Sequence, residues 1–319
     1  MARILSRLRQ ARHRFSVANL FHHEPTEQSQ QPDPEPQTSE MGAQKDKAQY
    51  DEFAEAYHKS TSEIPHSLLE SDLIRTALGD CKDCRILDLA GGSGNHARIA
   101  IEAGAAHIDL VDISASMMEI GEEMESKAGR DVIRWILADI SRPLSEQAVV
   151  PSLPREGYDI VMAIWSFDHV GTPAAYYEVW RNVACYLKPG GKLVGCRVRN
   201  PWSHCVQEGK YGARVKLTEP IPGGVKSSIV VNTKPPFEFD STAMEESLRG
   251  DTALPEYLGI GEVKSIDAAD TEVVRRDADY WADFVEVGDL PFRLCLYTEV
   301  VVLQDPYFVV FTARKKETP

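Results

Sequence analysis

Short apolar runs alternate with amphipathic stretches between about residues 80 and 196. Runs with the length and composition of buried β-strands occupy residues 85–89, 107–111, 132–137, 158–164 and 191–196. Apolar positions at helical spacing occupy residues 94–104, 115–128 and 172–187. Such alternation is typical of βαβ units, whose right-handed crossovers place helices on both faces of a parallel sheet. The pattern predicts an α/β, doubly wound, Rossmann-like domain.

Two helical patterns precede this core. Tyr50, Phe53, Ala54 and Tyr57 fall at positions i, i+3, i+4 and i+7, and a second periodic stretch runs from residue 64 to a stop at Gly79. Spacing of this kind favours amphipathic helices. We therefore expect two helices before the first strand.

The rhythm changes after residue 196. Three strand-like segments joined by Pro/Gly turns lie within residues 213–240, and helices are expected near 241–250 and 278–285. Residues 294–303 and 307–315 again have the composition of β-strands and are expected to complete the sheet as an antiparallel pair. The prediction is a seven-stranded, mostly parallel sheet with its core over about 80–196 and 294–316, and a β-rich cap over about 197–293, inserted after the fifth strand.

The first 45 residues have a different composition. Residues 1–23 carry five arginines and no acidic residue, and residues 24–44 are rich in Gln, Pro and Glu with almost no large apolar residue. Segments like the second cannot offset the entropy of ordering. We predict a disordered basic leader and linker over 1–45 and one domain over 46–319. An amphipathic presequence, a membrane-surface helix and a solvated terminus all remain open for the leader.

Composition excludes several classes of protein. The 319 residues are 43% hydrophobic, and 35 Lys and Arg face 49 Asp and Glu, a formal net charge of −14. This charge repels phosphate backbones, so no nucleic-acid partner is expected, and no apolar run is long enough for an integral membrane segment. Six scattered cysteines without a secretory signal indicate a reducing compartment. The expected location is cytoplasmic, with a mitochondrial or membrane-surface address through the basic segment as the alternative.

No metal site is predicted. Cys81 and Cys84 have CxxC spacing, but no second pair follows at the distance that a four-ligand zinc site requires.

A glycine-rich turn follows the first predicted strand, in the segment ILDLAGGSGNH over residues 86–96. A strand that runs into such a turn and then a helix brings backbone N–H groups against a nucleotide-like ligand. Residues 92–97 fit GxGxxA, and Asp112 lies 20 residues after Gly92, so an NAD(P)-dependent oxidoreductase of the Rossmann type is one reading.

Three carboxylates favour a different ligand. Asp88 lies inside the first strand, where a dinucleotide fold usually stays apolar, and suits a cationic ligand. Asp112 ends the second strand, where it can accept both hydroxyls of a ribose, and Asp139 ends the third, where an adenine amino group could reach it.

With these features the chain resembles the class I S-adenosylmethionine-dependent methyltransferases. The segments DLAGGSG, VDIS, ADI, YDIVMAIWSFDH and LKPGG are similar to the family's motifs in order and spacing over residues 85–196. One departure is Ala90, which stands where the family usually has its first glycine. The resemblance implies S-adenosylmethionine as the cofactor. It implies a cofactor site formed by Tyr57, Asp88, Ala90, Gly91, Gly92, Gly94, Asp112, Ile113, Met117, Asp139, Ile140 and Trp165.

The resemblance also suggests an activity. A base is needed when the acceptor is a phenol, a carboxylic acid or a protonated amine, and His169, near the carboxyl end of the fourth strand, is the candidate. Tyr57 would offer a cation–π contact to the sulfonium, or else is a core aromatic. A β-rich cap suggests an enclosed pocket, hence methylation of an oxygen or nitrogen of a small organic metabolite, as in secondary metabolism. A noncatalytic cofactor-binding subunit stays open, and the sequence does not indicate an oligomeric state.

Overall fold

The computed structural model describes residues 50–51, 54–55, 57–58, 64–148, 153–154, 156–284 and 306–317. Its contacts divide the chain into residues 1–36 and 37–319, and all described residues belong to the second unit. The predicted leader and linker over 1–45, and the strand predicted over 294–303, lie outside the described residues.

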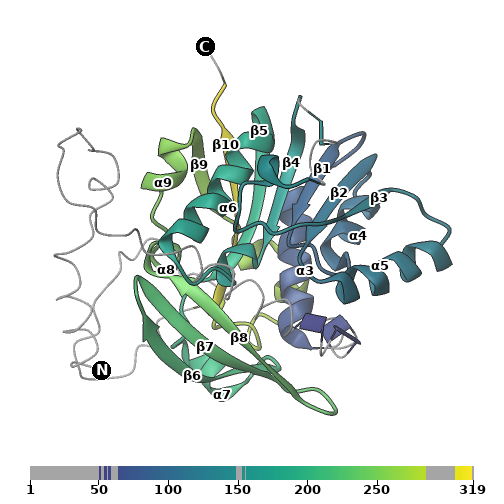
Figure 1. Cartoon of the computed structure of the whole chain (residues 1–319). Helices are drawn as coiled ribbons and strands as arrows, with labels where there is room; N and C mark the ends of the chain where they lie inside the picture. The colour runs from purple at the N-terminus through teal and green to yellow at the C-terminus, as the bar shows by residue number, and fades with distance from the viewer. Residues whose placement is uncertain are drawn as a thin grey trace, which may run out of the picture. The chain divides into compact units, whose positions relative to one another are not determined.

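A seven-stranded sheet forms the centre of this unit, in the order β3-β2-β1-β4-β5-β10-β9 (Figure 1). Its parallel strands are β1 (Arg85–Leu89), β2 (His107–Asp112), β3 (Ile133–Leu137), β4 (Tyr158–Ile164) and β5 (Leu187–Val198). The remaining two are β9 (Ile260–Ser265) and β10 (Phe308–Lys315), and β10 is antiparallel to both β5 and β9. The predicted seven-stranded, mostly parallel sheet is confirmed.

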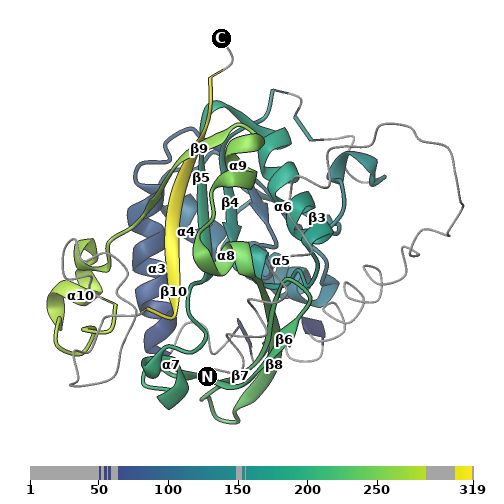
Figure 2. The same ribbon diagram turned by 90° about the vertical axis from the view of Figure 1, so that its left-hand side faces the viewer.

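The strand beside β10 differs from the prediction. It is β9, at residues 260–265, inside the range predicted as cap (Figure 2). Only the first two residues of β9 are buried. An edge strand that hides so little apolar surface gives almost no hydrophobic signal in the sequence.

The described helices are α3 (Pro65–Leu78), α4 (Asn95–Glu102), α5 (Ala115–Lys127), α6 (Pro173–Tyr186), α7 (His204–Glu208), α8 (Glu245–Arg249), α9 (Ala253–Tyr257) and α10 (Glu272–Arg276). Local chemistry sets several boundaries. The hydroxyls of Ser114 and Thr172 cap α5 and α6 by accepting backbone N–H groups. Gly79, with φ of 59°, ends α3. The boundaries predicted for α4, α5 and α6 agree within about two residues. The helix predicted over 278–285 is wrong for its described part, 278–284, which forms turns after α10.

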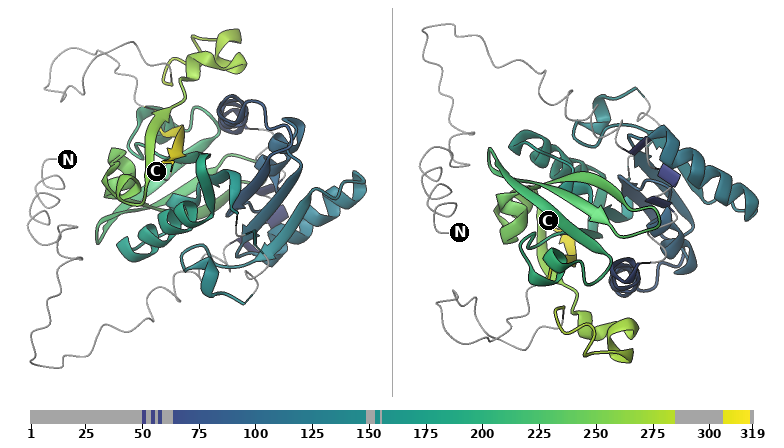
Figure 3. Two further views of the ribbon diagram at one scale, coloured as in Figure 1. Left: turned by 90° about the horizontal axis from the view of Figure 1, so that it is seen from above. Right: turned by 90° about the horizontal axis from the view of Figure 1, so that it is seen from below.

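Two hydrophobic layers cover the sheet. Apolar residues of α3 and α4 pack on one face, and those of α6 with Leu254 and Leu258 pack on the other. Seen from above, α3 is viewed end-on beside the sheet (Figure 3). The parallel strands are thereby buried on both faces, and their carboxyl ends are left as the accessible edge.

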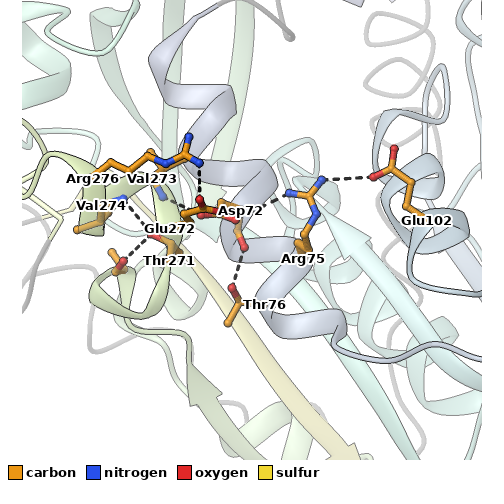
Figure 4. Close-up of polar contacts among 10 residues, drawn as sticks. Asp72, Arg75, Thr76, Glu102, Thr271, Glu272, Val273, Val274 and Arg276 are labelled. Atoms are coloured by element: carbon orange, nitrogen blue, oxygen red, sulfur yellow. Dashed lines mark hydrogen bonds and ion pairs between the residues drawn. The ribbon is translucent and has the colours of Figure 1, made fainter.

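Polar contacts fix α3 to its neighbours (Figure 4). Oδ2 of Asp72 accepts the N–H of Val273 in α10 at 3.0 Å. Arg75 reaches Glu102 of α4 at 3.4 Å. Both ion-pair partners are well exposed, so this pair contributes little. The buried apolar face of α3 is its main attachment.

A second, three-stranded antiparallel sheet forms the cap. Its strands are β6 (Ala213–Ile221), β7 (Gly224–Val231) and β8 (Phe237–Met244), which confirms the three predicted strands. The helix expected over 241–250 is shorter, because β8 runs to Met244 before α8 begins. The cap meets the end of β4, where the Ser241 hydroxyl donates to the carbonyl of Asp168 at 2.9 Å. In the described part of the chain, no helix is long and apolar enough to cross a membrane.

Candidate functional site

A cavity of about 450 Å³ lies at the carboxyl ends of β1 to β4 and extends to the cap. Most of the predicted site residues line it: Tyr57, Ala90, Gly91, Gly92, Asp112, Ile113, Met117, Asp139, Ile140, Trp165 and His169. Asp88 and Gly94 do not. Ligands of open α/β sheets bind at this edge. The structure therefore gathers residues spread over more than a hundred positions into one site.

The glycine-rich loop leaves no room for a side chain at Gly91. A Cβ on Gly91 would stand 2.5 Å from Cγ of Leu110 and 2.7 Å from Oδ2 of Asp88. Gly92 has φ of 55°, a conformation that costs other residues about 1 kcal/mol or more. Ala90 adopts φ of 58°, so the turn keeps its left-handed form without the glycine that the resemblance leads one to expect there.

Asp88 lies beneath this loop rather than in the cavity. It is 1% exposed, and its Oδ2 atom has no hydrogen-bond partner among the described residues. Burial raises the pKa of Asp88 to about 7, opposed in part by His96. A buried carboxylate oxygen without a partner is costly. Asp88 does not line the cavity, and its contact with a cofactor stays a prediction.

Asp112 links β2 to the glycine loop. Its Oδ2 accepts the N–H of Gly92 at 2.7 Å, and its Oδ1 accepts the N–H of Ser114 at 2.8 Å. Burial nevertheless raises its pKa. The N–H of Ile113 also contributes a hydrogen bond that favours the charged form. The carboxylate is thus held at the cavity wall, and its remaining lone-pair capacity can accept a further hydroxyl group.

Asp139 occupies the corresponding place after β3. Its Oδ1 accepts the N–H and the hydroxyl of Ser141 at 2.8 and 2.6 Å. Gln147 follows η2 (Leu144–Glu146) and clamps the Asp139 backbone, accepting from its N–H at 2.9 Å and donating to its carbonyl at 2.7 Å. With Ile113, Met117 and Ile140 nearby in the lining, this end of the cavity offers apolar faces and one polar edge. Such a slot suits a planar base.

Gly94 lies at the start of α4. It has φ of 79° and is the N-cap of α4, and a Cβ there would meet Trp135 at 3.0 Å. It opens the helix but does not line the cavity.

Aromatic side chains form the wall near the end of β4. Trp165 has φ of 61°, and its indole stacks on His66 at 5.7 Å and on Tyr307 at 6.3 Å. Tyr57 contacts Tyr50 edge-on at 5.6 Å. Their π-faces can contact a cation.

His169 follows η4 (Ser166–Asp168) and faces the same space. Its Nε2 lies 2.9 Å from the hydroxyl of Tyr50. Its Nδ1 is enclosed and has no partner among the described residues. Burial lowers the pKa of His169 to about 4, so the imidazole is neutral near pH 7. A neutral imidazole can accept a proton, but the enclosed Nδ1 is not accessible to a bound group, and Nε2 is the nitrogen that contacts another side chain, the Tyr50 hydroxyl.

The cap closes the other side of the cavity. Ile221, Pro222, Lys226, Asp240 and Thr242 of the cap line it. A smaller space of about 60 Å³ adjoins it and is lined by Phe237 and Phe239 of β8 together with Tyr50, Tyr57 and His169. The two spaces share Tyr50, Tyr57, Trp165 and His169 as lining residues.

Several lining residues were missed from the sequence. Tyr50 lies seven positions before Tyr57 on the same helical face, a signal that could have identified it. His96 directly follows the glycine loop, but nothing local marks its partner Glu70. The cap residues carry no motif, because their role depends on where the inserted sheet docks.

Comparison with known proteins identifies the core. A family model for the methyltransferase domain matches residues 86–191, which span β1 to β5 without the cap. This region is a class I methyltransferase domain. The resemblance seen in the sequence is thus confirmed, with S-adenosylmethionine as the cofactor of the domain. The strand order differs from that of a dinucleotide-binding sheet, in which the sixth strand of the order 3-2-1-4-5-6 follows the fifth, because here the antiparallel β10 lies between β5 and β9.

Two curated relatives are similar in sequence to part of this chain. A demethylmenaquinone methyltransferase of Clavibacter sepedonicus is 28% identical over 54% of this chain and 65% of its own length. A ubiquinone/menaquinone biosynthesis C-methyltransferase UbiE of Brucella suis is 31% identical over 34% and 37% of the two chains. This chain therefore spans less than two thirds of the length of either relative.

A solved structure extends the similarity of fold. The CcbJ methyltransferase from Streptomyces caelestis superposes with a TM-score of 0.54 at 14% identity, over 83% of this chain and 96% of that one. At that identity the likeness concerns the fold alone. The superposition covers more of the chain than residues 86–191, which match the family model.

Proposed function

We propose that this protein transfers a methyl group from S-adenosylmethionine to an oxygen or nitrogen of a small organic molecule. The observation that carries the proposal is the set of residues that line one cavity. Asp112 and Asp139, which suit a ribose and an adenine, line it together with His169 and residues of the cap. The UbiE relative of Brucella suis is named as a C-methyltransferase. Methylation of carbon is therefore the second candidate.

The described residues fit this cofactor. Asp112 would accept the ribose hydroxyls, Asp139 with Ile113 and Ile140 would frame the adenine, and the Gly91–Gly92 turn would lie against the ligand without side chains in the way. Trp165 and Tyr57 would offer π-faces toward the sulfonium, a contact worth about 0.5–2 kcal/mol.

For the transfer itself, the protein mainly has to align the acceptor with the methyl group and exclude water. When bound, S-adenosylmethionine would supply an electrophilic methyl group to a lone pair of the acceptor. His169 takes the proton that the acceptor then loses. A pKa near 4 suffices, because an oxygen or nitrogen that is gaining a methyl group is far more acidic than before.

Cofactor binding is the first test. Calorimetry with S-adenosylhomocysteine should show binding to the full chain, whereas reduced nicotinamide cofactors should not bind. Failure to bind S-adenosylhomocysteine would contradict the proposal. Binding without transfer to any acceptor would favour a noncatalytic subunit.

Acceptor chemistry needs a second test. Cofactor with a carbon-13 methyl group is incubated with fractions of a metabolite extract, and the labelled product is examined by NMR. Methyl groups on oxygen, nitrogen and carbon resonate in different regions. A product labelled on carbon would support the second candidate and overturn the first.

The state of the cysteines bears on the cellular compartment in which the protein works. We propose a reducing compartment, the cytoplasm or the mitochondrial matrix, because Cys81, Cys84, Cys185, Cys196 and Cys205 are all free thiols. Imaging the full chain beside a variant that lacks residues 1–45 would separate these addresses.

A further inference from the structure

A buried carboxylate contacts the first turn of α4, directly after the glycine loop. Glu70 of α3 is 6% exposed. Its Oε1 lies 2.7 Å from Nε2 of His96, and its Oε2 lies 3.6 Å from Nδ1 of His66. A carboxylate this deeply buried is tolerated only with charged or hydrogen-bonding partners. The short contact makes His96 the main one.

The two histidines differ in charge. Burial lowers the pKa of His66 despite the nearby carboxylate. Burial also opposes charge on His96, but the hydrogen bond and the charge of Glu70, with a contribution from Asp88 of β1, outweigh it and raise its pKa, against a small opposing effect of Arg98. In turn, His96, His66 and Trp165 hold the pKa of Glu70 below its ordinary value, although burial alone would raise it. Glu70 and His96 thus form a buried ion pair.

His96 also faces the cavity. Its side chain is 20% exposed and lines the ligand space beside Asn95 and Ser93. Arg98, the other cation of the first two turns of α4, is engaged elsewhere, since it reaches Glu125 at 3.2 Å and the carbonyl of Ser93 at 2.9 Å. The positive charge that the loop presents to a ligand at this end is therefore that of His96.

S-adenosylmethionine carries a carboxylate in its amino-acid part, and this is the anionic group that a cationic His96 could bind. Asp112 and Asp139 take the adenosine end, so the amino-acid end of the cofactor extends along the loop toward the start of α4. We propose that His96, fixed by Glu70, binds the carboxylate of the cofactor's amino-acid part as an imidazolium. Glu70 is then a positioning residue that acts through His96. This inference rests on the proposed function.

Two ligands separate this role from a purely structural one. S-adenosylhomocysteine carries the carboxylate, and 5′-methylthioadenosine lacks the whole amino-acid part. Calorimetry on the full chain compares both ligands with the wild type, Glu70→Gln and His96→Gln. The control is Glu208→Gln, which disrupts another His–Glu pair, His204–Glu208 at 3.2 Å, that is exposed and does not line the cavity.

The expected result is a split between the ligands. Either substitution weakens S-adenosylhomocysteine binding about tenfold, the usual scale for a charge-assisted hydrogen bond, and leaves 5′-methylthioadenosine within about twofold. The wild-type affinity for S-adenosylhomocysteine falls as the pH rises above the raised pKa of His96, because the imidazolium loses its proton, and His96→Gln removes this dependence. Glu208→Gln changes neither ligand.

The contrary results are distinct. An equal loss for both ligands would mean that the pair only supports the loop, and unchanged binding of both would mean that it has no part in recognition; either overturns the inference. His96→Gln keeps the buried carboxylate and serves if Glu70→Gln fails to fold. A wild type that binds neither ligand would contradict the proposed function itself.

Discussion

The hydroxyl of Tyr50 lies 2.9 Å from Nε2 of His169, across 119 positions of sequence. A residue of the helical segment that precedes the core thereby fixes an imidazole at the end of β4. With Nε2 engaged, Nδ1 is the nitrogen left without a partner among the described residues. The contact holds the imidazole of His169, the base in the proposed function, in a fixed orientation.

Removal of the imidazole should slow the reaction more than it affects cofactor binding. We expect His169→Ala to lower kcat about 10²–10⁴-fold, the usual contribution of a general base, and Tyr50→Phe to lower it about tenfold through loss of one hydrogen bond. Steady-state kinetics beside calorimetry with S-adenosylhomocysteine checks both. Unchanged turnover in His169→Ala would remove this residue as the base.

The pH dependence of turnover follows from the lowered pKa of His169. The pKa is about 4, so the imidazole is neutral and able to accept a proton above that pH. Turnover of an acceptor that does not itself titrate should be flat between about pH 5 and 8 and fall below about pH 4.5. A limb near pH 6.5 would show that the histidine is not buried during turnover.

Asp112 should be essential for cofactor affinity. Replacement by Ala removes the acceptor for the ribose and leaves the N–H groups of Gly92 and Ser114 without their partner. We expect S-adenosylhomocysteine affinity to fall about a hundredfold or more, since hydrogen bonds to a charged group contribute about 1.5–3 kcal/mol each. Asp131→Ala, at an exposed position before β3, is the control. An affinity within threefold of wild type would contradict the assignment.

The close approach at Gly91 predicts a steric effect. Gly91→Ala would place Cβ 2.5 Å from Leu110, and we expect a loss of about 1–3 kcal/mol of unfolding free energy together with weaker cofactor binding. Gly129→Ala meets no atom within 4 Å, although Gly129 has φ of 64°. It should cost about 1 kcal/mol and leave binding intact. Denaturant unfolding and calorimetry on both variants provide the comparison.

Asp168 predicts a pH-dependent stability. It is 1% exposed, and burial raises its pKa from the ordinary 3.8 to about 8. The folded protein then holds a proton that the unfolded chain releases, so its contribution to stability is lost as pH rises from about 4 to about 8. Asp168→Asn cannot ionise, and its advantage over wild type should grow by up to about 1.4 kcal/mol per pH unit in that window. A difference that does not change with pH would show that Asp168 is charged when folded.

The core could be predicted because its signals are local. A buried parallel strand must be apolar throughout, a glycine loop must be glycine where backbone meets ligand, and Asp112 and Asp139 mark the ends of their strands. The edge strand at 260–265 escaped prediction because it buries too little to leave a pattern. Asp88 and Gly94 belong to the same motif but do not line the cavity, and their predicted contacts with the cofactor stay predictions.

The sequence by itself determined the α/β core, the glycine loop with its acidic partners, and the three cap strands, because each depends on residues close together in the chain. The tertiary structure decided which distant groups meet. Glu70 reaches His96, Tyr50 reaches His169, and the cap residues reach the cavity only because helices and strands far apart in sequence are packed together. Side-chain chemistry at such a site depends on distances of about 3 Å, and these are a property of the packed fold.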